Sequence, residues 1–279
     1  MLDIQLNTIV CEDNVRVMKT LPDTCVDLTC TSPPYDAMRR YSGEIAISNM
    51  WDFESVAQQL WRVTKDGGVV VWVVADATKN GSETGTSFRQ VIYFQSLGFN
   101  IHDTMIYKTH KPPSSAKRYH NTWEFMFVFS KGSPKTWNPI MERCLWAGVG
   151  TSPSQRTENG GLIRTKTTRR VIKDKKPRSN IWHYDTGSGK GTSQHPASFP
   201  LQLAKDHIVS WSNPEDLVLD PFAGSGTTLV AAKELGRHFI GVEIHAKYVD
   251  ICNARIAQTI MDVHRDDDAL QLPNQKELF

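Results

Sequence analysis

The chain has 279 residues, of which 39% are hydrophobic and 22% are charged, and its formal net charge is +2. This composition is ordinary for a soluble globular protein, and the length favours one large α/β domain with an insertion over two equal domains. No stretch approaches the roughly 20 apolar residues of a membrane span, and the first residues lack the basic and apolar regions of a signal peptide, so we expect an intracellular protein with no membrane partner.

The five cysteines form no CxxC pair, and their odd number suits a reducing compartment better than a disulfide framework. Cys25 and Cys30 flank or lie in a predicted strand, where a small buried hydrophobic side chain is the simplest interpretation. We therefore expect no metal site.

The N-terminal half of the chain alternates short apolar strands with helices. Residues 8–11 are typical of a buried strand, and residues 26–30 of a second one that runs directly into Ser32-Pro33-Pro34-Tyr35. Because proline cannot continue a ladder, the second strand must end there and expose its last residues at a sheet edge. Further elements are expected over 16–21 (helix), 53–63 (helix), 69–74 (strand), 88–97 (helix), 105–107 (strand) and 125–129 (strand), with a turn at 66–68 and a loop at 36–50.

The alternation resumes near the C-terminus, after a block that lacks it. Residues from about 138 to 179 are polar, basic and rich in Thr, Gly and Arg. Beyond them we expect a strand over 216–220, a helix over 227–235, a strand over 238–243 and a helix over 246–260, followed by an acidic tail. Strand, helix and strand on both sides of one non-alternating block indicate an α/β fold: a doubly wound, mostly parallel, Rossmann-like sheet with an inserted module.

The segment from Asp220 to Thr228, Asp-Pro-Phe-Ala-Gly-Ser-Gly-Thr-Thr, has the features of a cofactor turn. Its glycines let the backbone pass close to a ligand, and Thr227 opens a helix with free N–H groups. Glu243 ends the next strand, 19 residues after Gly224, where a carboxylate can accept both hydroxyls of a ribose.

Three cofactor classes, and a tight turn without any ligand, compete for this segment. A phosphate loop needs a Lys before the Ser/Thr, which is absent, and a dinucleotide fingerprint would want Gly where Leu229 stands. A cofactor with a ribose but no pyrophosphate fits best, and S-adenosylmethionine is the common one.

The segment Ser32-Pro33-Pro34-Tyr35 is suited to binding a planar amine. The exocyclic amine of a nucleobase is a poor nucleophile because its lone pair is delocalised into the ring. A site that methylates it should accept hydrogen bonds from the NH₂ and hold the ring against an aromatic face. Ser32 Oγ and the Pro33 carbonyl can accept those bonds, and Tyr35 can stack on the ring. The competing interpretation is a Pro-Pro turn with a packed tyrosine.

With these motifs in this order, the chain resembles the DNA amino methyltransferases that use S-adenosylmethionine, in the permuted arrangement called the beta group and with an SPPY motif. In that group the SPPY segment precedes the target-recognition region and the FxGxG segment follows it. The resemblance covers nearly the whole chain and rests on Asp13, Ser32 to Tyr35, Asp66-Gly67-Gly68, Trp123-Glu124, His195-Pro196, Phe199-Pro200, Asp220 to Thr228 and Glu243.

The resemblance implies a methyltransferase sheet with residues 1–137 as the amine-binding half, 138–180 as the target-recognition insertion, 181–262 as the cofactor-binding half and 263–279 as an acidic tail. Asp13 would approach the cofactor's adenine amine, the segment from His195 to Pro200 would lie under its methionine part, and Glu243 would hold its ribose. The implied catalytic residues are Ser32, Pro33, Pro34 and Tyr35. The implied cofactor-binding residues are Asp13, Thr31, His195, Pro196, Phe199, Asp220, Pro221, Phe222, Gly224, Ser225, Gly226, Thr227 and Glu243.

A basic run lies in the insertion. Between Arg164 and Arg178, eight basic residues stand against one acid, Asp174, which is a local excess of seven positive charges. A solvated loop is the usual explanation of such a run, but beside these motifs it is expected to contact DNA phosphates. The expected DNA-binding residues are Arg39, Arg40, Arg164, Lys166, Arg169, Arg170, Lys173, Lys175, Lys176 and Arg178.

The implied reaction is a direct attack of the amine on the sulfonium methyl group, for which the base is flipped out of duplex DNA. The chain has no Pro-Cys nucleophile, which argues against methylation of cytosine C5. We also expect residues 36–50 to close over the flipped nucleotide. In this family Ser before Pro-Pro-Tyr is associated with cytosine N4, and Asp or Asn with adenine N6, so cytosine N4 is favoured and adenine N6 is the alternative.

Two other functions compete with this one. Methylation of RNA or of a protein amide uses similar chemistry, but the large basic module favours duplex DNA. A DNA-binding regulator that has lost catalysis should show damage to one half-site, and neither segment is damaged. The implied partner is double-stranded DNA in the cytoplasm of a bacterial or phage-infected cell, and a homodimer and a cognate restriction nuclease stay open.

Overall fold

The computed structural model describes residues 5–34, 51–109, 117–151, 154–156, 159, 161–164, 170–184 and 199–263. The chain forms two compact units, one made of Met1–Asn138 with Asn180–Phe279 and a second made of Pro139–Ser179. The following predictions fall outside the described residues: Tyr35, Arg39, Arg40, Lys166, Arg169, His195, Pro196, the loop at 36–50 and residues 264–279 of the acidic tail.

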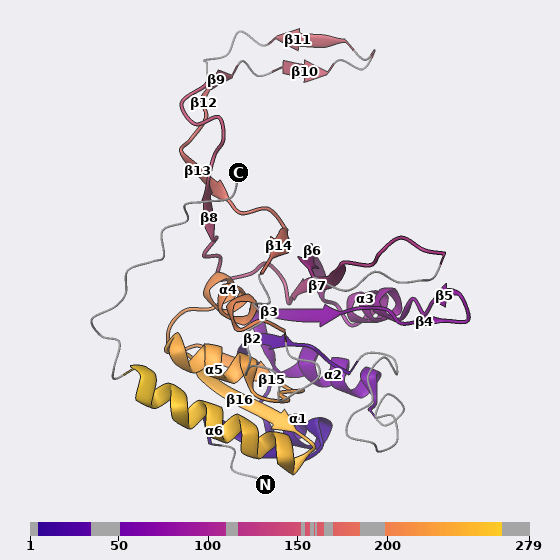
Figure 1. Cartoon of the computed structure of the whole chain (residues 1–279), viewed down its shortest axis with the longest axis vertical. Helices are drawn as coiled ribbons and strands as arrows, with labels where there is room; N and C mark the ends of the chain where they lie inside the picture. The colour runs from indigo at the N-terminus through magenta and orange to yellow at the C-terminus, as the bar shows by residue number, and fades with distance from the viewer. Residues whose placement is uncertain are drawn as a thin grey trace. The chain divides into compact units, whose positions relative to one another are not determined.

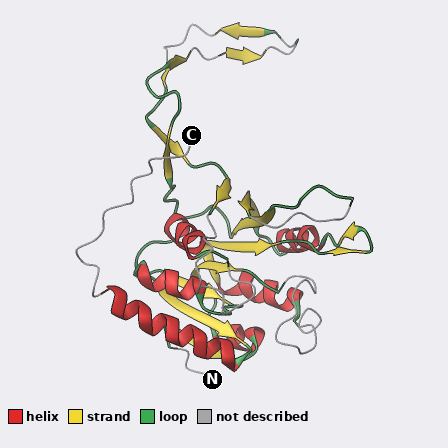
Figure 2. Cartoon of the chain, in the orientation of Figure 1, coloured by secondary structure: helices red, strands yellow, loops and turns green. Residues whose placement is uncertain are grey.

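The described part of the first unit is built on an eight-stranded sheet (Figures 1 and 2). The order across the sheet is β1 (Thr8–Cys11), β16 (His238–Glu243), β15 (Leu217–Asp220), β2 (Val26–Thr31), β3 (Thr64–Val74), β7 (Trp123–Ser130), β6 (Asn100–Lys108) and β14 (Ile181–His183). Among these described strands, β7 runs antiparallel to both of its neighbours and the remaining pairs are parallel. The expected doubly wound, mostly parallel sheet is confirmed.

The helices lie on both faces of the sheet. Helices α1 (Asn14–Thr20), α2 (Phe53–Val63) and α3 (Thr86–Ser96) share a buried apolar cluster with Trp72 and Phe127 on one face. Met126 precedes Phe127 and so points to the other face, where its Sδ lies 3.3 Å from Nε2 of His207. That face carries α4 (Leu201–Trp211), α5 (Thr227–Glu234) and α6 (Ala246–Val263), each packed on the next.

Helix α4 was not predicted from the sequence. It buries Asp206, His207 and Ser210 together with Leu203 and Ile208. The helix therefore lacks the clean apolar stripe by which a surface helix is recognised. One of its buried polar groups is satisfied from outside the helix, because Tyr184 Oη donates a hydrogen bond to Asp206 Oδ2 over 2.7 Å.

The turn expected at 66–68 lies inside β3. Between the pairs Val26↔Thr64 and Leu28↔Val69, β3 advances five residues while β2 advances two, so the extra residues bulge out of the ladder. Gly67 has a φ of +80° in this bulge, and its N–H donates to the Lys131 carbonyl over 2.6 Å. The glycine pair thus shapes the start of the strand and does not separate it from the preceding helix.

The second unit consists of short paired strands along one irregular hairpin. Strand β8 (Met141–Arg143) pairs with β13 (Lys175–Pro177), β9 (Gly150–Thr151) with β12 (Arg170–Val171), and β10 (Ser154–Arg156) with β11 (Leu162–Arg164), all antiparallel. A further short hairpin, β4 (Thr78–Lys79) with β5 (Ser82–Glu83), precedes α3 in the first unit. None of the helices in the described residues is both long enough and apolar enough to span a membrane.

Candidate active site

The two predicted half-sites follow two strands that lie side by side. Strand β2 ends just before Ser32, strand β15 ends at Asp220, and the two strands pair in parallel. Thr31 Oγ1 donates a hydrogen bond to Asp220 Oδ1 over 2.6 Å, and both groups are buried. In the first turn of α5, Thr228 Oγ1 donates to the Cys30 carbonyl over 3.1 Å. Segments that are far apart in the sequence therefore meet at one edge of the sheet.

Asp220 fixes the start of the turn that follows β15. Its side chain is only 3% exposed, and besides Thr31 it accepts a hydrogen bond from the Phe222 N–H over 3.1 Å. Burial, which disfavours the charged form, raises the pKa of Asp220 to about 6, and the two hydrogen bonds oppose that rise. This carboxyl group thus ties the amine-side strand to the cofactor-side turn.

The glycines of the turn are required by its backbone and by a close neighbour. Gly224 and Gly226 have φ values of 52° and 81°, in the left-handed region that residues with a Cβ rarely adopt. A Cβ on Gly226 would overlap Sγ of Cys252, a buried residue of α6. Only a glycine lets α6 approach this closely, and Gly224, Ser225 and Gly226 are all buried.

Helix α6 also contributes a polar clamp that the sequence analysis did not find. Arg255 Nη1 donates to the Ser225 carbonyl over 2.6 Å and to Ser225 Oγ over 3.0 Å, and it lies 3.4 Å from Thr227 Oγ1. Burial lowers the pKa of Arg255, but a guanidinium remains charged at neutral pH. An arginine on a long C-terminal helix carries no sequence signal for this contact.

Glu243 has the position expected of a group that holds a ribose. It ends β16, its Oε2 accepts a hydrogen bond from the Gly224 N–H over 3.0 Å, and its Oε1 accepts one from the His245 N–H over 2.9 Å. Burial raises its pKa, and the backbone hydrogen bonds counteract the effect. A carboxylate can accept more than two hydrogen bonds, so a carboxylate fixed beside a glycine turn fits a cofactor with a ribose diol.

The remaining cofactor-side predictions lie near this turn or before α4. Asp13 follows β1, whose Cys11 pairs with Glu243, and its Oδ1 caps α1 by accepting from the Arg16 N–H over 2.9 Å. The Pro221 carbonyl accepts a hydrogen bond from Asn14 Nδ2 over 3.1 Å. Phe199 lies before α4 and is half-buried, but no described contact links it to the turn.

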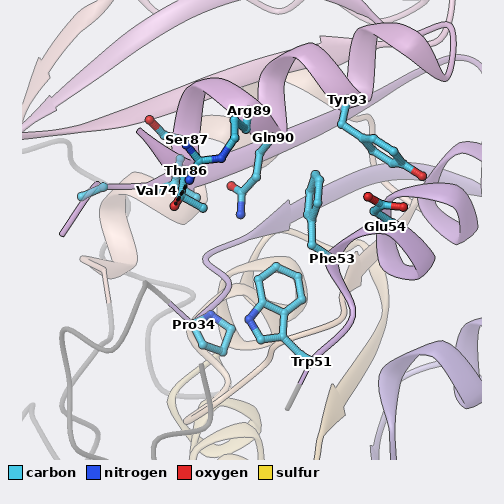
Figure 3. A pocket seen from close by; sticks show the side chains of 11 residues that line it. Pro34, Trp51, Phe53, Glu54, Val74, Thr86, Ser87, Arg89, Gln90 and Tyr93 are labelled. Atoms are coloured by element: carbon cyan, nitrogen blue, oxygen red, sulfur yellow. Dashed lines mark hydrogen bonds between the residues drawn. The ribbon is translucent and has the colours of Figure 1, made fainter. Parts of the chain in front are cut away.

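A cavity of about 430 Å³ opens on the amine side of the site (Figure 3). It lies beyond the carboxyl ends of β2 and β3, between the first turns of α2 and α3. Within the SPPY motif, Ser32 and Pro34 are partly exposed and Pro33 is buried. The cavity is lined by Pro34, Trp51, Phe53, Glu54, Val74, Ala75, Thr86, Ser87, Arg89, Gln90 and Tyr93.

Aromatic rings connect this cavity to the cofactor turn. The ring of Trp51 lies edge-on to Phe222, with centroids 5.0 Å apart, and Phe53 packs edge-on to Tyr93 at 5.4 Å. Trp72 lies behind both cavity rings, with centroids 6.3 Å from Trp51 and 6.2 Å from Phe53. The predicted cofactor residue Phe222 therefore supports a wall of the cavity. Sequence analysis assigned Trp51 and Phe53 no role because each has the pattern of an ordinary core residue.

The predicted DNA-binding residues of the second unit lie on its paired strands and the links between them. Lys173, Lys175 and Lys176 are exposed, and Arg178 is half-buried. Lys176 Nζ lies 3.0 Å from Glu142 across the β8–β13 pair, and the hydrogen bond to this carboxylate raises the pKa of Lys176. Arg164 and Arg170 belong to β11 and β12. The role of these residues, like the target-recognition role of the insertion, stays a prediction.

The fold and the relatives of the chain define its class. Its sheet is that of a Rossmann-like methyltransferase: the structure matches that of TTHA0409, a putative DNA modification methylase of Thermus thermophilus described in complex with S-adenosyl-L-methionine, with a TM-score of 0.61, 24% identity, and 91% and 95% of the two chains covered. It also matches the PvuII DNA methyltransferase, described as cytosine-N4-specific, with a TM-score of 0.65, 21% identity and coverage of 92% and 91%.

Sequence comparison gives the family. The model of the DNA methylase family of N6/N4 methyltransferases matches residues 26–254. The orphan methyltransferase M.BamHII of Bacillus amyloliquefaciens is 46% identical over an alignment of 252 residues, with 87% of this chain and 93% of that protein covered. The chain belongs to this DNA methylase family and is a DNA methyltransferase of the N4/N6 type.

Proposed function

We propose that this protein transfers a methyl group from S-adenosylmethionine to N4 of a cytosine flipped out of duplex DNA, as an SPPY-type member of the permuted beta group. The observation that carries the choice of base is Ser32, which follows β2 directly and stands two residues before Pro34, a residue that lines the cavity. The fold similarity to the cytosine-N4-specific PvuII enzyme supports this choice.

The cofactor turn supplies the groups that such a donor needs. Glu243 would accept the ribose hydroxyls, the Gly224-Ser225-Gly226 turn would lie against the ribose and methionine parts, and the first N–H groups of α5 would face the ligand. When bound, S-adenosylmethionine supplies a sulfonium methyl group that a nucleophile can take. The turn and the SPPY segment are joined by the Thr31–Asp220 hydrogen bond, so the cofactor and the amine would be held in a constant relation.

The SPPY segment supplies hydrogen-bond acceptors for the cytosine amine, and these acceptors account for its orientation without a general base. Ser32 Oγ and the Pro33 carbonyl would accept the two hydrogens of the cytosine amine and orient the nitrogen lone pair toward the methyl group. The two prolines limit the backbone freedom of this segment, so little ordering remains to be done when the base binds. Tyr35 would cover one face of the ring.

The second unit is proposed to hold and read the DNA. Exposed Lys173 and Lys175 would contact phosphates, and Arg39 and Arg40 would add contacts near the flipped nucleotide. Such contacts release counterions, so DNA binding should weaken steeply as salt is added. M.BamHII is described as an orphan methyltransferase, which supports a protein that acts without a cognate nuclease.

Mass spectrometry of nucleosides tests the proposal. The purified protein is incubated with unmethylated plasmid DNA and S-adenosylmethionine that carries a deuterated methyl group, and the DNA is then digested. Deuterated N4-methylcytosine is expected, and a Gly226→Val variant should form none, which ties the product to this protein. Deuterated N6-methyladenine without N4-methylcytosine would establish the adenine alternative, and binding without any transfer would establish a regulator.

A further inference from the structure

The side chain of Gln90 is held in one orientation at the wall of the cavity. Thr86, Gln90 and Tyr93 share one face of α3 and line the cavity together (Figure 3). Gln90 Oε1 accepts a hydrogen bond from Trp72 Nε1 over 3.0 Å, in the buried core. Because an indole N–H can only donate, the amide oxygen must face Trp72, and the amide NH₂ must face the cavity.

Within the described residues this NH₂ group has no acceptor, and its nitrogen is not sealed from solvent. Gln90 is only 7% exposed, and within the described residues Trp72 is its one hydrogen-bond partner. The NH₂ group can bond water in the free cavity, and a ligand atom that accepts its hydrogen bond would replace that water. The other walls include the rings of Trp51, Phe53 and Tyr93, which suit a planar heteroaromatic ligand.

The helix that carries Gln90 is itself anchored to the sheet edge. Asp76, two residues beyond β3, accepts hydrogen bonds from the Ser87 N–H over 3.0 Å, from Ser87 Oγ, and from Thr84 Oγ1 over 3.1 Å. Ser87 is buried, so the first turn of α3 is fixed to the end of β3. The Gln90 donor is therefore positioned before any ligand binds.

We propose that Gln90 is a specificity-determining residue, whose amide NH₂ donates hydrogen bonds to the acceptor edge of the target cytosine. The proposal rests on the proposed function, because it takes the base amine to be bound at Ser32 and Pro33. Beside its N4 amine, cytosine presents two neighbouring acceptors, N3 and O2. One N–H of the amide can point at this edge and donate to O2, with N3 beside it as a second, shared acceptor.

The same donor discriminates against adenine. Next to its N6 amine adenine presents one ring acceptor, N1, and beyond it a C–H group. An N–H aimed at the position of cytosine O2 would meet this C–H group, and an amide held by Trp72 cannot rotate its oxygen toward it without losing the indole hydrogen bond. Gln90 would thus favour cytosine, where Ser32 alone discriminates weakly.

The test uses full-length protein and three variants. Gln90→Glu keeps an oxygen for Trp72 but removes the NH₂, and Gln90→Leu removes both groups. Gln95→Glu is the matched control, since Gln95 is exposed on the same helix and outside the cavity. After the wild-type recognition site is mapped on plasmid DNA, initial rates are measured at about pH 8, far above the usual glutamate pKa. The substrates are duplexes with cytosine or adenine at the methylated position.

Both Gln90 variants should lower kcat/KM on the cytosine duplex by about tenfold to a hundredfold, and should lower the preference for cytosine over adenine. Binding of S-adenosylmethionine should not change, and Gln95→Glu should match wild type. Equal loss on both duplexes, or wild-type rates in Gln90→Glu, would overturn the proposal while leaving the proposed function intact. A wild-type product of N6-methyladenine alone would instead refute the proposed base before any variant is made.

Discussion

The cofactor turn and the amine-side cavity lie at the same sheet edge, but they are built from different parts of the chain. The turn consists of backbone: two glycines in the left-handed region, held by Asp220, Glu243 and Arg255. The cavity is lined by side chains, chiefly aromatic rings and one amide, from the segment that opens α2 and from α3. The turn does not tolerate a side chain in place of its glycines, because its conformation and packing depend on the bare backbone. The cavity, in contrast, can be altered by replacing one side chain at a time. This difference suits a part that binds one cofactor and a part that selects one base.

The largest expected effect is that of adding a methyl group to the turn. Gly226→Ala should lower the free energy of unfolding by roughly 2–5 kcal/mol, because it combines a left-handed backbone with overlap on Cys252. Gly236→Ala is the matched control: its φ is +68°, but no atom lies within 4 Å of the added Cβ, so it should cost only about 1–2 kcal/mol. Urea unfolding measures both, and equal losses would mean that the close approach of α6 does not constrain the turn.

A second effect concerns the link between the two regions. Thr31→Val should lower the free energy of unfolding by about 1–3 kcal/mol, because it leaves buried Asp220 without its hydroxyl donor. Thr29→Val, two residues earlier in β2, should be neutral or stabilising, since within the described residues Thr29 Oγ1 is buried without a hydrogen-bond partner. If the two substitutions behaved alike, Thr31 would not connect the turn to the amine segment.

A smaller effect, on the KM for S-adenosylmethionine, distinguishes the cofactor turn from the cavity. Arg255→Met should raise KM for S-adenosylmethionine by about tenfold and leave kcat nearly unchanged, because it removes a charge-assisted hydrogen bond that positions Ser225. Arg89→Met, at the exposed rim of the cavity, should leave that KM unchanged. Initial rates at varied cofactor concentration measure both constants. A comparable rise in Arg89→Met would indicate that the cavity also positions the cofactor.

The smallest expected effect is a pH dependence of Tm that comes from Asp220, at the start of the turn. Burial raises the folded-state pKa of Asp220 to about 6, above its usual value of 3.8, so between these values the folded protein binds more protons than the unfolded chain. The contribution of Asp220 to stability is therefore present in full below about pH 3.8 and is lost as the pH rises through 6. Asp220→Asn should flatten the change in Tm between about pH 4 and 6. An unchanged dependence of Tm on pH would show that groups other than Asp220 cause it. The carboxylate of the cavity, Glu54, is exposed and so differs from buried Asp220.

Some features of the site were predictable because short-range chemistry specifies them. The strand that ends at Glu243, the helix that opens at Thr227 and the glycines between them were expected where the structure has them. Helix α2 has the expected bounds, since its apolar residues recur with helical spacing. Helix α4 was missed because its polar residues are buried only by neighbouring elements, which leave no local signature in the sequence. The bulge at Gly67 was missed because it depends on a hydrogen bond to Lys131, which is remote in the sequence.

By itself, the sequence determined most of the segments that form strands and helices and which turns need glycine. It also predicted that one segment accepts an amine while another admits a ribose. These properties depend on backbone sterics, hydrophobic spacing and the chemistry of single side chains. Only the tertiary structure decided that Thr31 bonds to Asp220, that Arg255 holds Ser225, and that Trp72 turns the Gln90 amide toward a cavity. The first and second of these pairs are separated by 189 and 30 residues, and such partners meet only after the sheet is assembled and both of its faces are packed.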